Sequence, residues 1–96
     1  MEIIVKIEKK LSERSGIGKQ SGKAWKAAEF LASTLPSGPY EAEKIVFDVT
    51  DNDKGRVSQF ESSVGSIKTV GFTIEARETD QGRWFNSVKG WYVKNM

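Results

Sequence analysis

The 96-residue chain contains no cysteine and no histidine. Without cysteine no disulfide can form, so the fold must rest on a hydrophobic core, for which 38% hydrophobic residues suffice. The two absences also exclude Ser–His–Asp and Cys–His nucleophiles, and zinc sites built from thiolates or imidazoles. We therefore expect a single domain over residues 1–96 that has no cofactor and is not an enzyme.

Long hydrophobic runs are also missing, so the sequence predicts no membrane-spanning segment and no membrane partner. Residues 1–6 lack the basic start, the long apolar stretch and the small-residue cleavage site of a signal peptide. We therefore expect a cytoplasmic protein.

Acidic residues are unevenly distributed along the chain. Residues 1–26 carry a formal net charge of +4, residues 27–64 carry −4 and residues 65–96 carry +2. If the two ends of the chain form one surface, that surface is basic and suits a polyanion. A mixed, ordinary soluble surface is the alternative interpretation of the charge alone.

Alternation of apolar and polar residues predicts strands near both ends of the chain. The first strand is indicated by the alternate positions Ile3, Val5 and Ile7. A second alternation begins at residue 68, and one of its faces consists of Val70, Phe72, Ile74 and Ala76. Residues 79–82, Thr-Asp-Gln-Gly, predict a hairpin turn, after which the last strand runs from about residue 83 to residue 94.

The middle of the chain is less regular. Residues 12–22 are polar, contain glycine and show no periodicity, so we expect a flexible loop. Residues 23–34 fit either a helix, because of their alanines, or a strand, and residues 36–39 end this segment with a turn. Residues 44–49 are β-branched and aromatic and predict a strand.

A turn at residues 51–55 follows this strand, and a short amphipathic helix is predicted by Val57, Phe60 and Val64. If residues 23–34 form a strand, the chain is an all-β, five-stranded OB-fold barrel with its helix between strands three and four. OB folds commonly bind oligonucleotides with the second and third strands and the first and last loops.

Two short motifs are imperfect. The segment Gly16–Lys23 resembles a phosphate-binding loop, but Ile17, Ser21 and Ala24 stand where the two common patterns need glycine or a hydroxyl. A basic loop that closes over a nucleic-acid backbone, or an ordinary surface loop, fits it better. The acids Asp48, Asp51 and Asp53 could hold a hard cation, but turn-forming aspartates explain them better.

Aromatic residues interleaved with basic ones give the strongest signal. Each of the three tryptophans lies within two residues of a lysine or arginine. Single-stranded nucleic acid is bound by this combination, because bases stack on aromatic rings while cations contact phosphates. We expect Trp25 to face outward and Trp84 to lie in the core, together with Phe47, Phe60 and Phe72.

A family resemblance rests on Gly22-Lys23-x-Trp25-Lys26, Glu29-Phe30, Phe47-x-Val49, Phe72-x-Ile74-Glu75-x-Arg77-Glu78 and Gly82-Arg83-Trp84-Phe85 with Trp91. The chain resembles a small family of uncharacterised bacterial and phage OB-fold proteins thought to bind single-stranded DNA. Residues 77–84 also resemble the last hairpin of bacterial single-stranded-DNA-binding proteins. The resemblance implies that residues 23–34 form a strand and that DNA crosses strands two and three, between residues 12–22 and 77–83.

We therefore expect a non-catalytic protein that binds single-stranded DNA with little sequence preference, with RNA as the alternative strand. A homodimer is expected by analogy with other small OB folds. The expected stacking residues are Trp25, Phe85, Trp91 and Tyr92, and the expected phosphate contacts are Lys19, Lys23, Lys26, Arg77, Arg83 and Lys89. The alternative function is an OB-fold protein–protein interaction module with exposed aromatic residues at its contact surface.

Overall fold

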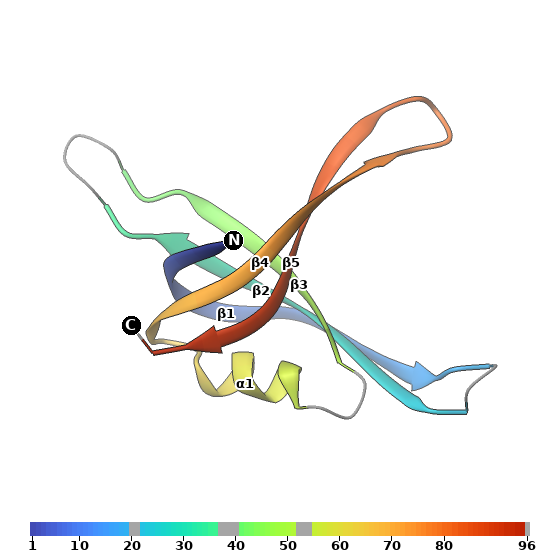
Figure 1. The fold of residues 1–96 in the computed structure, drawn as a ribbon, viewed down its shortest axis with the longest axis horizontal. Helices are drawn as coiled ribbons and strands as arrows, with labels where there is room; N and C mark the ends of the chain where they lie inside the picture. Colours follow the sequence, from blue (N-terminus) through green and yellow to red (C-terminus); the bar gives the residue numbers. More distant parts are fainter. Residues whose placement is uncertain (20–21, 37–40, 52–54, 96) are drawn as a thin grey trace.

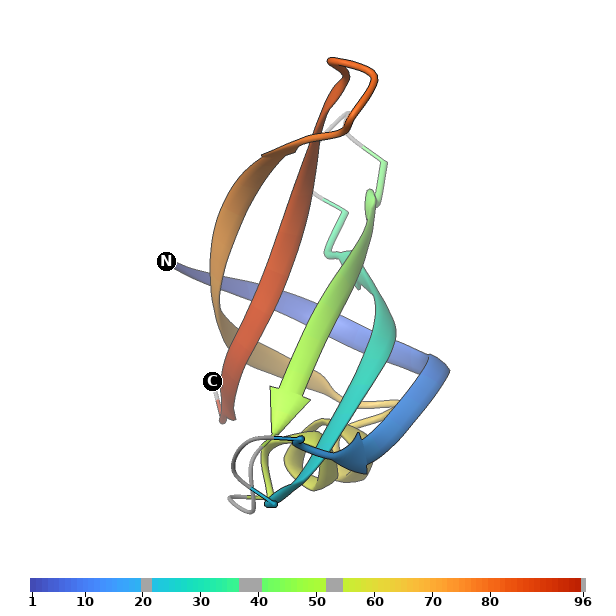
Figure 2. The same ribbon diagram turned by 90° about the vertical axis from the view of Figure 1, so that its right-hand side faces the viewer.

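The computed structural model describes residues 1–19, 22–36, 41–51 and 55–95. It contains five strands and one helix, namely β1 (Glu2–Ile17), β2 (Ala24–Thr34), β3 (Lys44–Asp51), α1 (Arg56–Ser62), β4 (Ile67–Glu78) and β5 (Trp84–Lys94). The strands form a closed barrel in the order β1-β2-β3-β5-β4 (Figures 1 and 2). All neighbouring strands are antiparallel except β3 and β5. The expected all-β barrel with one short helix between strands three and four is confirmed, and its strand order is that of an OB fold.

The helix-or-strand ambiguity of residues 23–34 is settled in favour of a strand. β2 lies between β1 and β3 and pairs with both over most of its length. Ala28, Phe30 and Ala32 occupy alternate positions and are buried. Helix propensity is a weak preference that tertiary pairing overrides, and small alanines fit the crowded wall of a narrow barrel.

The core lies inside the barrel and beneath it, where α1 covers one end (Figure 2). Phe60 of α1 is fully buried, and its ring centroid lies 5.5 Å from that of Phe30 and 6.5 Å from that of Phe47. The expected core positions of Phe47 and Phe60 are confirmed, and Phe72 packs against the core while partly buried. Val64, in contrast, lies beyond the end of α1 and is exposed, so the helix is shorter than predicted.

The start of α1 is held by a buried acid from β3. The backbone N–H of Val57 donates a hydrogen bond to Oδ2 of Asp51 at 3.2 Å. This bond satisfies one of the N–H groups that have no partner within the first turn of a helix. Gly55, immediately before the helix, has φ of 72°, a conformation that favours glycine.

The expected loop over residues 12–22 is wrong for its first half, because β1 continues to Ile17. Residues 12–17 pair with residues 24–29 of β2 and form a two-stranded projection, here called the β1–β2 arm. Main-chain hydrogen bonds hold this hairpin, so it needs no alternation of apolar side chains. Its length therefore left no periodic signal in the sequence.

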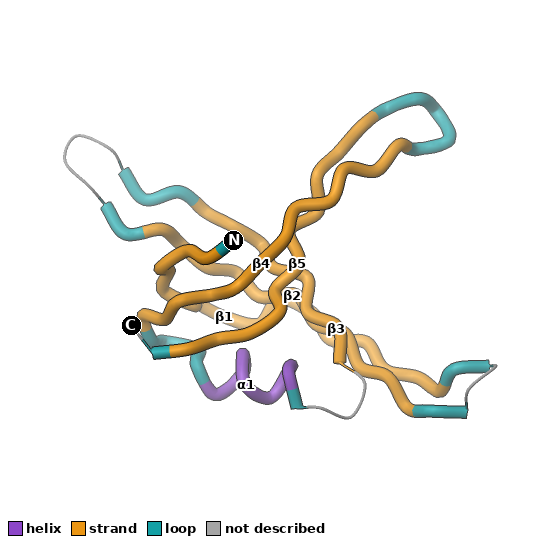
Figure 3. The backbone as a smooth tube through the Cα atoms, in the orientation of Figure 1, coloured by secondary structure: helices purple, strands orange, loops and turns teal. Residues whose placement is uncertain are grey.

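A second projection, here called the β4–β5 arm, consists of residues 74–78 and 84–88. Both arms extend beyond the barrel on the same side of Figure 1, and Figure 3 shows that they are strand almost to their ends. The predicted turn at residues 79–82 is confirmed, since the N–H of Thr79 donates to the carbonyl oxygen of Arg83 at 2.7 Å. In the described part of the chain, no helix is long and apolar enough to cross a membrane.

Candidate nucleic-acid interface

The two arms border a depression of about 170 Å³ on the outer surface of the sheet. Three cations line it, Arg14 from β1, Arg77 from β4 and Lys89 from β5. The small side chains of Ala27 and Ser87 also line the depression and leave it open. The fold thus brings together positive charges that lie up to 75 positions apart in the sequence.

Acidic side chains lie among these cations. Asp48 lines the depression and is opposite Glu29 in β2 and Lys89 in β5. Burial raises the pKa of Asp48, and Glu29 raises it further, against the opposing effect of Arg14, Lys89 and Arg77. Ionisation of Asp48 in the folded protein therefore has a free-energy cost.

Glu75 neutralises two of the cations in the free protein. One of its oxygens, Oε2, lies 3.2 Å from Nζ of Lys89 and 3.4 Å from a terminal nitrogen of Arg77. Lys89 donates the hydrogen bond that does most to lower the pKa of Glu75. A phosphate group bound here would compete with this carboxylate for both cations, a role for Glu75 that the sequence did not indicate.

Two of the expected stacking residues lie on β5 beside the depression. Phe85 is opposite Arg77 across the β4–β5 arm and is 49% exposed. The indole N–H of Trp91 donates to Oγ1 of Thr73 at 2.8 Å, and the Arg56 guanidinium lies 5.2 Å from the centroid of the indole ring. An exposed ring therefore adjoins a cation at both positions, the combination that single-stranded nucleic acid uses.

Trp25 is half-buried on the β1–β2 arm, opposite Gly16. A Cβ on Gly16 would lie only 2.9 Å from Cζ2 of Trp25, so the indole packs directly on the glycine backbone. Trp25 alternates with Ala27, which lines the depression, and so belongs to the outward side of β2. Trp25 lies nearer the tip of the β1–β2 arm than Ala27 does.

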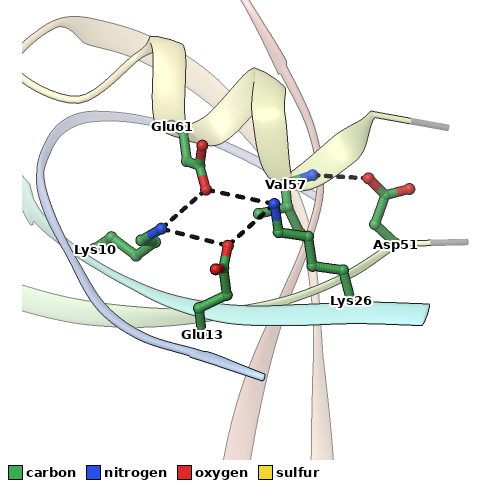
Figure 4. Close-up of polar contacts among 6 residues, drawn as sticks. All are labelled: Lys10, Glu13, Lys26, Asp51, Val57 and Glu61. Carbon is green, nitrogen blue, oxygen red and sulfur yellow. Dashed lines mark hydrogen bonds and ion pairs between the residues drawn. The ribbon is translucent and has the colours of Figure 1, made fainter. Parts of the chain in front are cut away.

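Lys26 belongs to a different cluster (Figure 4). Its Nζ lies 3.1 Å from Glu13 and 4.0 Å from Glu61 of α1, and the same two carboxylates contact Lys10. Lys26 follows Trp25 and precedes Ala27, so its side chain leaves β2 on the opposite face. The four charges connect the β1–β2 arm to the helix, which gives Lys26 a structural role.

Tyr92 is also separated from the depression. Its hydroxyl donates a short hydrogen bond to Glu2 of β1, and its ring covers Gly71 of β4. Glu2 raises the pKa of Tyr92 through this hydrogen bond and also forms an ion pair with Lys94 at 2.8 Å. These contacts place Tyr92 on the β1–β4 side of the barrel.

The remaining expected cations lie toward the ends of the arms. Lys19 and Lys23 belong to the connection between β1 and β2, where the N–H of Gly18 donates to the Lys23 carbonyl at 2.8 Å. Arg83 belongs to the turn of the β4–β5 arm, and its N–H donates to Oγ1 of Thr79. These residues flank the depression and do not line it.

The expectation that Trp84 lies in the core is wrong, since this side chain is 67% exposed. Trp84 does lie on the face of the arm that continues the interior of the barrel, but the arm extends past the residues that would cover it. Arg14 was missed for a related reason. In a loop the direction of the Arg14 side chain would be undefined. Arg14 instead lies in β1 opposite Ala27 of β2, and both residues line the depression.

The described residues of the two imperfect motifs have structural roles. Asp51 caps α1, Asp53 lies outside the described residues, and the described part of the chain contains no group of three or more acids that could hold a metal ion. The glycine-bearing segment from Gly16 belongs to a hairpin and leads into a strand, without the helix N-terminus that a phosphate loop requires. Residues 20 and 21 of this segment also lie outside the described residues.

Comparison with known proteins assigns the chain to a family. No curated protein matches the chain. A family model covers almost the whole barrel, from the first residue of β1 to the last residue of β5. The chain therefore belongs to the family described as a domain of unknown function (DUF3127), which matches residues 2–94.

Proposed function

We propose that this protein binds single-stranded DNA with little sequence preference and without catalysis. The observation that carries the proposal is the meeting of Arg14, Arg77 and Lys89 in one depression of an OB-type barrel. Phe85 and Trp91 extend this cationic surface with exposed rings. Cations that follow a backbone beside rings that accept bases are the usual means of binding a single strand.

The shape of the surface favours a single strand that crosses β2 and β3 between the two arms. OB folds commonly bind oligonucleotides there, and the resemblance to single-stranded-DNA-binding proteins supports the same path. Lys19, Lys23 and Arg83, which flank the depression, would extend the phosphate contacts along the strand. Ring stacking accepts every base, so we expect little sequence preference. RNA is the alternative strand, and the cytoplasm is the proposed location.

The test is fluorescence anisotropy of a labelled oligo-dT of about 20 nucleotides, titrated with the full chain at about 50 and 200 mM salt. The three cations that line the depression predict a logarithmic salt slope of at least about −2 in magnitude for a single strand, so affinity should fall at least about 20-fold between these salt concentrations. Unlabelled duplex of equal length should compete poorly. Absence of binding at the lower salt concentration, by protein that circular dichroism shows to be folded, would contradict the proposal.

A further inference from the structure

Glu75 lies at the border of the depression, between two of the cations that line it. Its partner across the β4–β5 arm is Ser87, which lines the depression, and alternation along β4 puts Glu75 on the same face as Arg77. A single carboxylate oxygen, Oε2 of Glu75, contacts both Lys89 and Arg77. This oxygen therefore takes the position that an anionic ligand of these two cations would need.

The contacts of Glu75 are of a kind that is easily exchanged. Only one guanidinium nitrogen of Arg77 contacts the carboxylate, at 3.4 Å, and the side chains of Arg77 and Glu75 are 57% and 44% exposed. Exposed ion pairs contribute little to the stability of a protein. A phosphate group, in contrast, offers Arg77 two oxygens in the geometry that a guanidinium binds best. A phosphate can therefore replace the carboxylate at both cations.

The β4–β5 arm does not need these ion pairs to keep its shape. Its two strands are paired from Thr73 opposite Lys89 to Glu78 opposite Trp84, and main-chain hydrogen bonds hold such a ladder together. Displacement of the Glu75 carboxylate therefore leaves the positions of both cations on the sheet unchanged.

We propose that Glu75 is an internal competitor for a backbone phosphate of the bound strand, and that this phosphate binds between Arg77 and Lys89. The inference rests on the proposed function, because it concerns the contacts of DNA with the depression. In the free protein the carboxylate neutralises both cations. In the complex it is displaced toward solvent, where it still repels the phosphate that replaced it. Glu75 thus lowers the affinity for every anion that depends on these two cations.

Arg14 gives a nucleic-acid strand an advantage over a small anion. It lines the same depression, and among the described residues it forms no ion pair with a carboxylate. A strand carries several linked phosphates, so one can contact Arg14 while the next replaces the carboxylate of Glu75. A small anion gains only one of these contacts. The competitor therefore makes the depression select polyanions over single anions such as chloride.

Glu75→Gln tests the proposal, because it removes the negative charge and keeps the size of the side chain. In anisotropy titrations of the full chain at about 50 mM salt, the variant should bind oligo-dT about two- to tenfold more tightly than the wild type. The matched control is Glu13→Gln. Glu13 also bridges two cations, Lys10 at 3.3 Å and Lys26 at 3.1 Å, but it precedes Arg14 and so lies on the other face of β1. Both variants change the net charge equally, so equal gains, or no gain from Glu75→Gln, would overturn the proposal.

A double-variant cycle separates competition from repulsion at a distance. The gain from Glu75→Gln should shrink in a Lys89→Ala background, because one of the two cations that the carboxylate occupies is then missing. An undiminished gain would show that Glu75 acts through its general field, and would overturn the proposal. If the wild type binds oligo-dT and Glu75→Gln binds no more tightly, only the competitor role is lost. If neither protein binds, although circular dichroism shows both to be folded, the proposed function fails and the competitor role fails with it.

Discussion

Asp48 and Lys89 lie opposite each other at one of the two residue pairs through which β3 and β5 close the barrel. Glu29 occupies the position opposite Asp48 on β2, so two carboxylates are neighbours at this closure. Like charges directly opposite each other destabilise a sheet. The closure between β3 and β5 also lines the candidate interface, and the repulsion between Asp48 and Glu29 there works against the attraction of Lys89.

Asp48→Asn should stabilise the fold at neutral pH. The substitution removes one of two opposed carboxylates, a change expected to add a few tenths to about 1 kcal/mol to the free energy of unfolding. Urea denaturation of the two proteins at pH 7 measures it. The same variant should bind oligo-dT more tightly, because it removes negative charge from the depression. A destabilised variant would show that the attraction of Asp48 to Arg14, Arg77 and Lys89 outweighs its burial and the repulsion from Glu29.

The stabilisation by Asp48→Asn should depend on pH. Because the folded protein raises the pKa of Asp48, the protonated acid favours folding, and this contribution is lost as the pH rises through the raised pKa. The difference between variant and wild type should therefore be largest above the raised pKa and should disappear below the ordinary value of 3.8. Urea denaturation at a series of pH values tests this. A difference that did not change with pH would assign the effect to hydrogen bonding instead.

Lys89→Ala should weaken oligo-dT binding and reduce its salt dependence. Loss of one phosphate contact predicts a salt slope smaller in magnitude by about 0.7. The matched control is Lys68→Ala, which removes the same charge from a strand lysine whose Nζ donates to Asn95, outside the depression. Anisotropy titrations at several salt concentrations compare the two variants. Equal effects would mean that overall charge, and not the depression, governs binding.

Phe85→Ala should remove a base-stacking contact, which costs about 1–3 kcal/mol of binding free energy, or about 5- to 150-fold in affinity. Tyr92→Ala is the comparison, because Tyr92 is almost as exposed but contacts Glu2 and Gly71 on another side of the barrel. Titrations with oligo-dT at one salt concentration should separate the two variants. Weakening by Tyr92→Ala alone would move the stacking surface away from the depression.

Gly90→Ala should destabilise the barrel by about 1–3 kcal/mol through overpacking. A Cβ on Gly90 would lie 2.7 Å from Cζ of Phe60 and 3.3 Å from Cγ2 of Val49, both of which are fully buried residues. Urea denaturation measures the loss. Phe60→Leu shortens the side chain that meets the new methyl group, so the double variant should lose less stability than the sum of the single variants. Strict additivity would show that the core adjusts elsewhere.

Asp51→Ala should cost about 0.5–2 kcal/mol, because the N–H of Val57 loses its side-chain acceptor. Asp51→Asn retains an acceptor oxygen of similar reach and should lose much less. The free energy of unfolding in urea compares the variants. Equal losses would show that the negative charge of Asp51, and not its hydrogen bond to the helix, is what stabilises this end of α1.

The amino-acid pattern predicted the first strand and the helix, each of which has one covered face. Alternation at Val5 and Ile7 predicted the start of β1, and the apolar spacing of Val57 and Phe60 predicted α1 because those side chains pack into the core. The turn at residues 79–82 was readable because glycine at position 82 adopts φ of 77°. For residues 23–34 the pattern left two structures open, and pairing with β1 and β3 decided between them.

The types of residue in the candidate interface were predictable from the sequence, but only some of the individual residues were. Aromatic residues interleaved with basic ones near the end of the chain, such as Phe85 and Lys89, were recognised from composition and position. The sequence by itself determined strands near both ends of the chain, a short helix and cations beside aromatic rings, because these depend on local periodicity and composition. Only the tertiary structure decided that Arg14 joins the depression, that Lys26 and Tyr92 turn to other partners, and that Trp84 is exposed. The outcomes for Arg14 and Trp84 depend on how far two hairpins extend beyond the barrel, and main-chain pairing sets that length without a signature in the side chains. The partners of Lys26 and Tyr92, Glu61 and Glu2, are distant in the sequence, so only the fold brings them into contact.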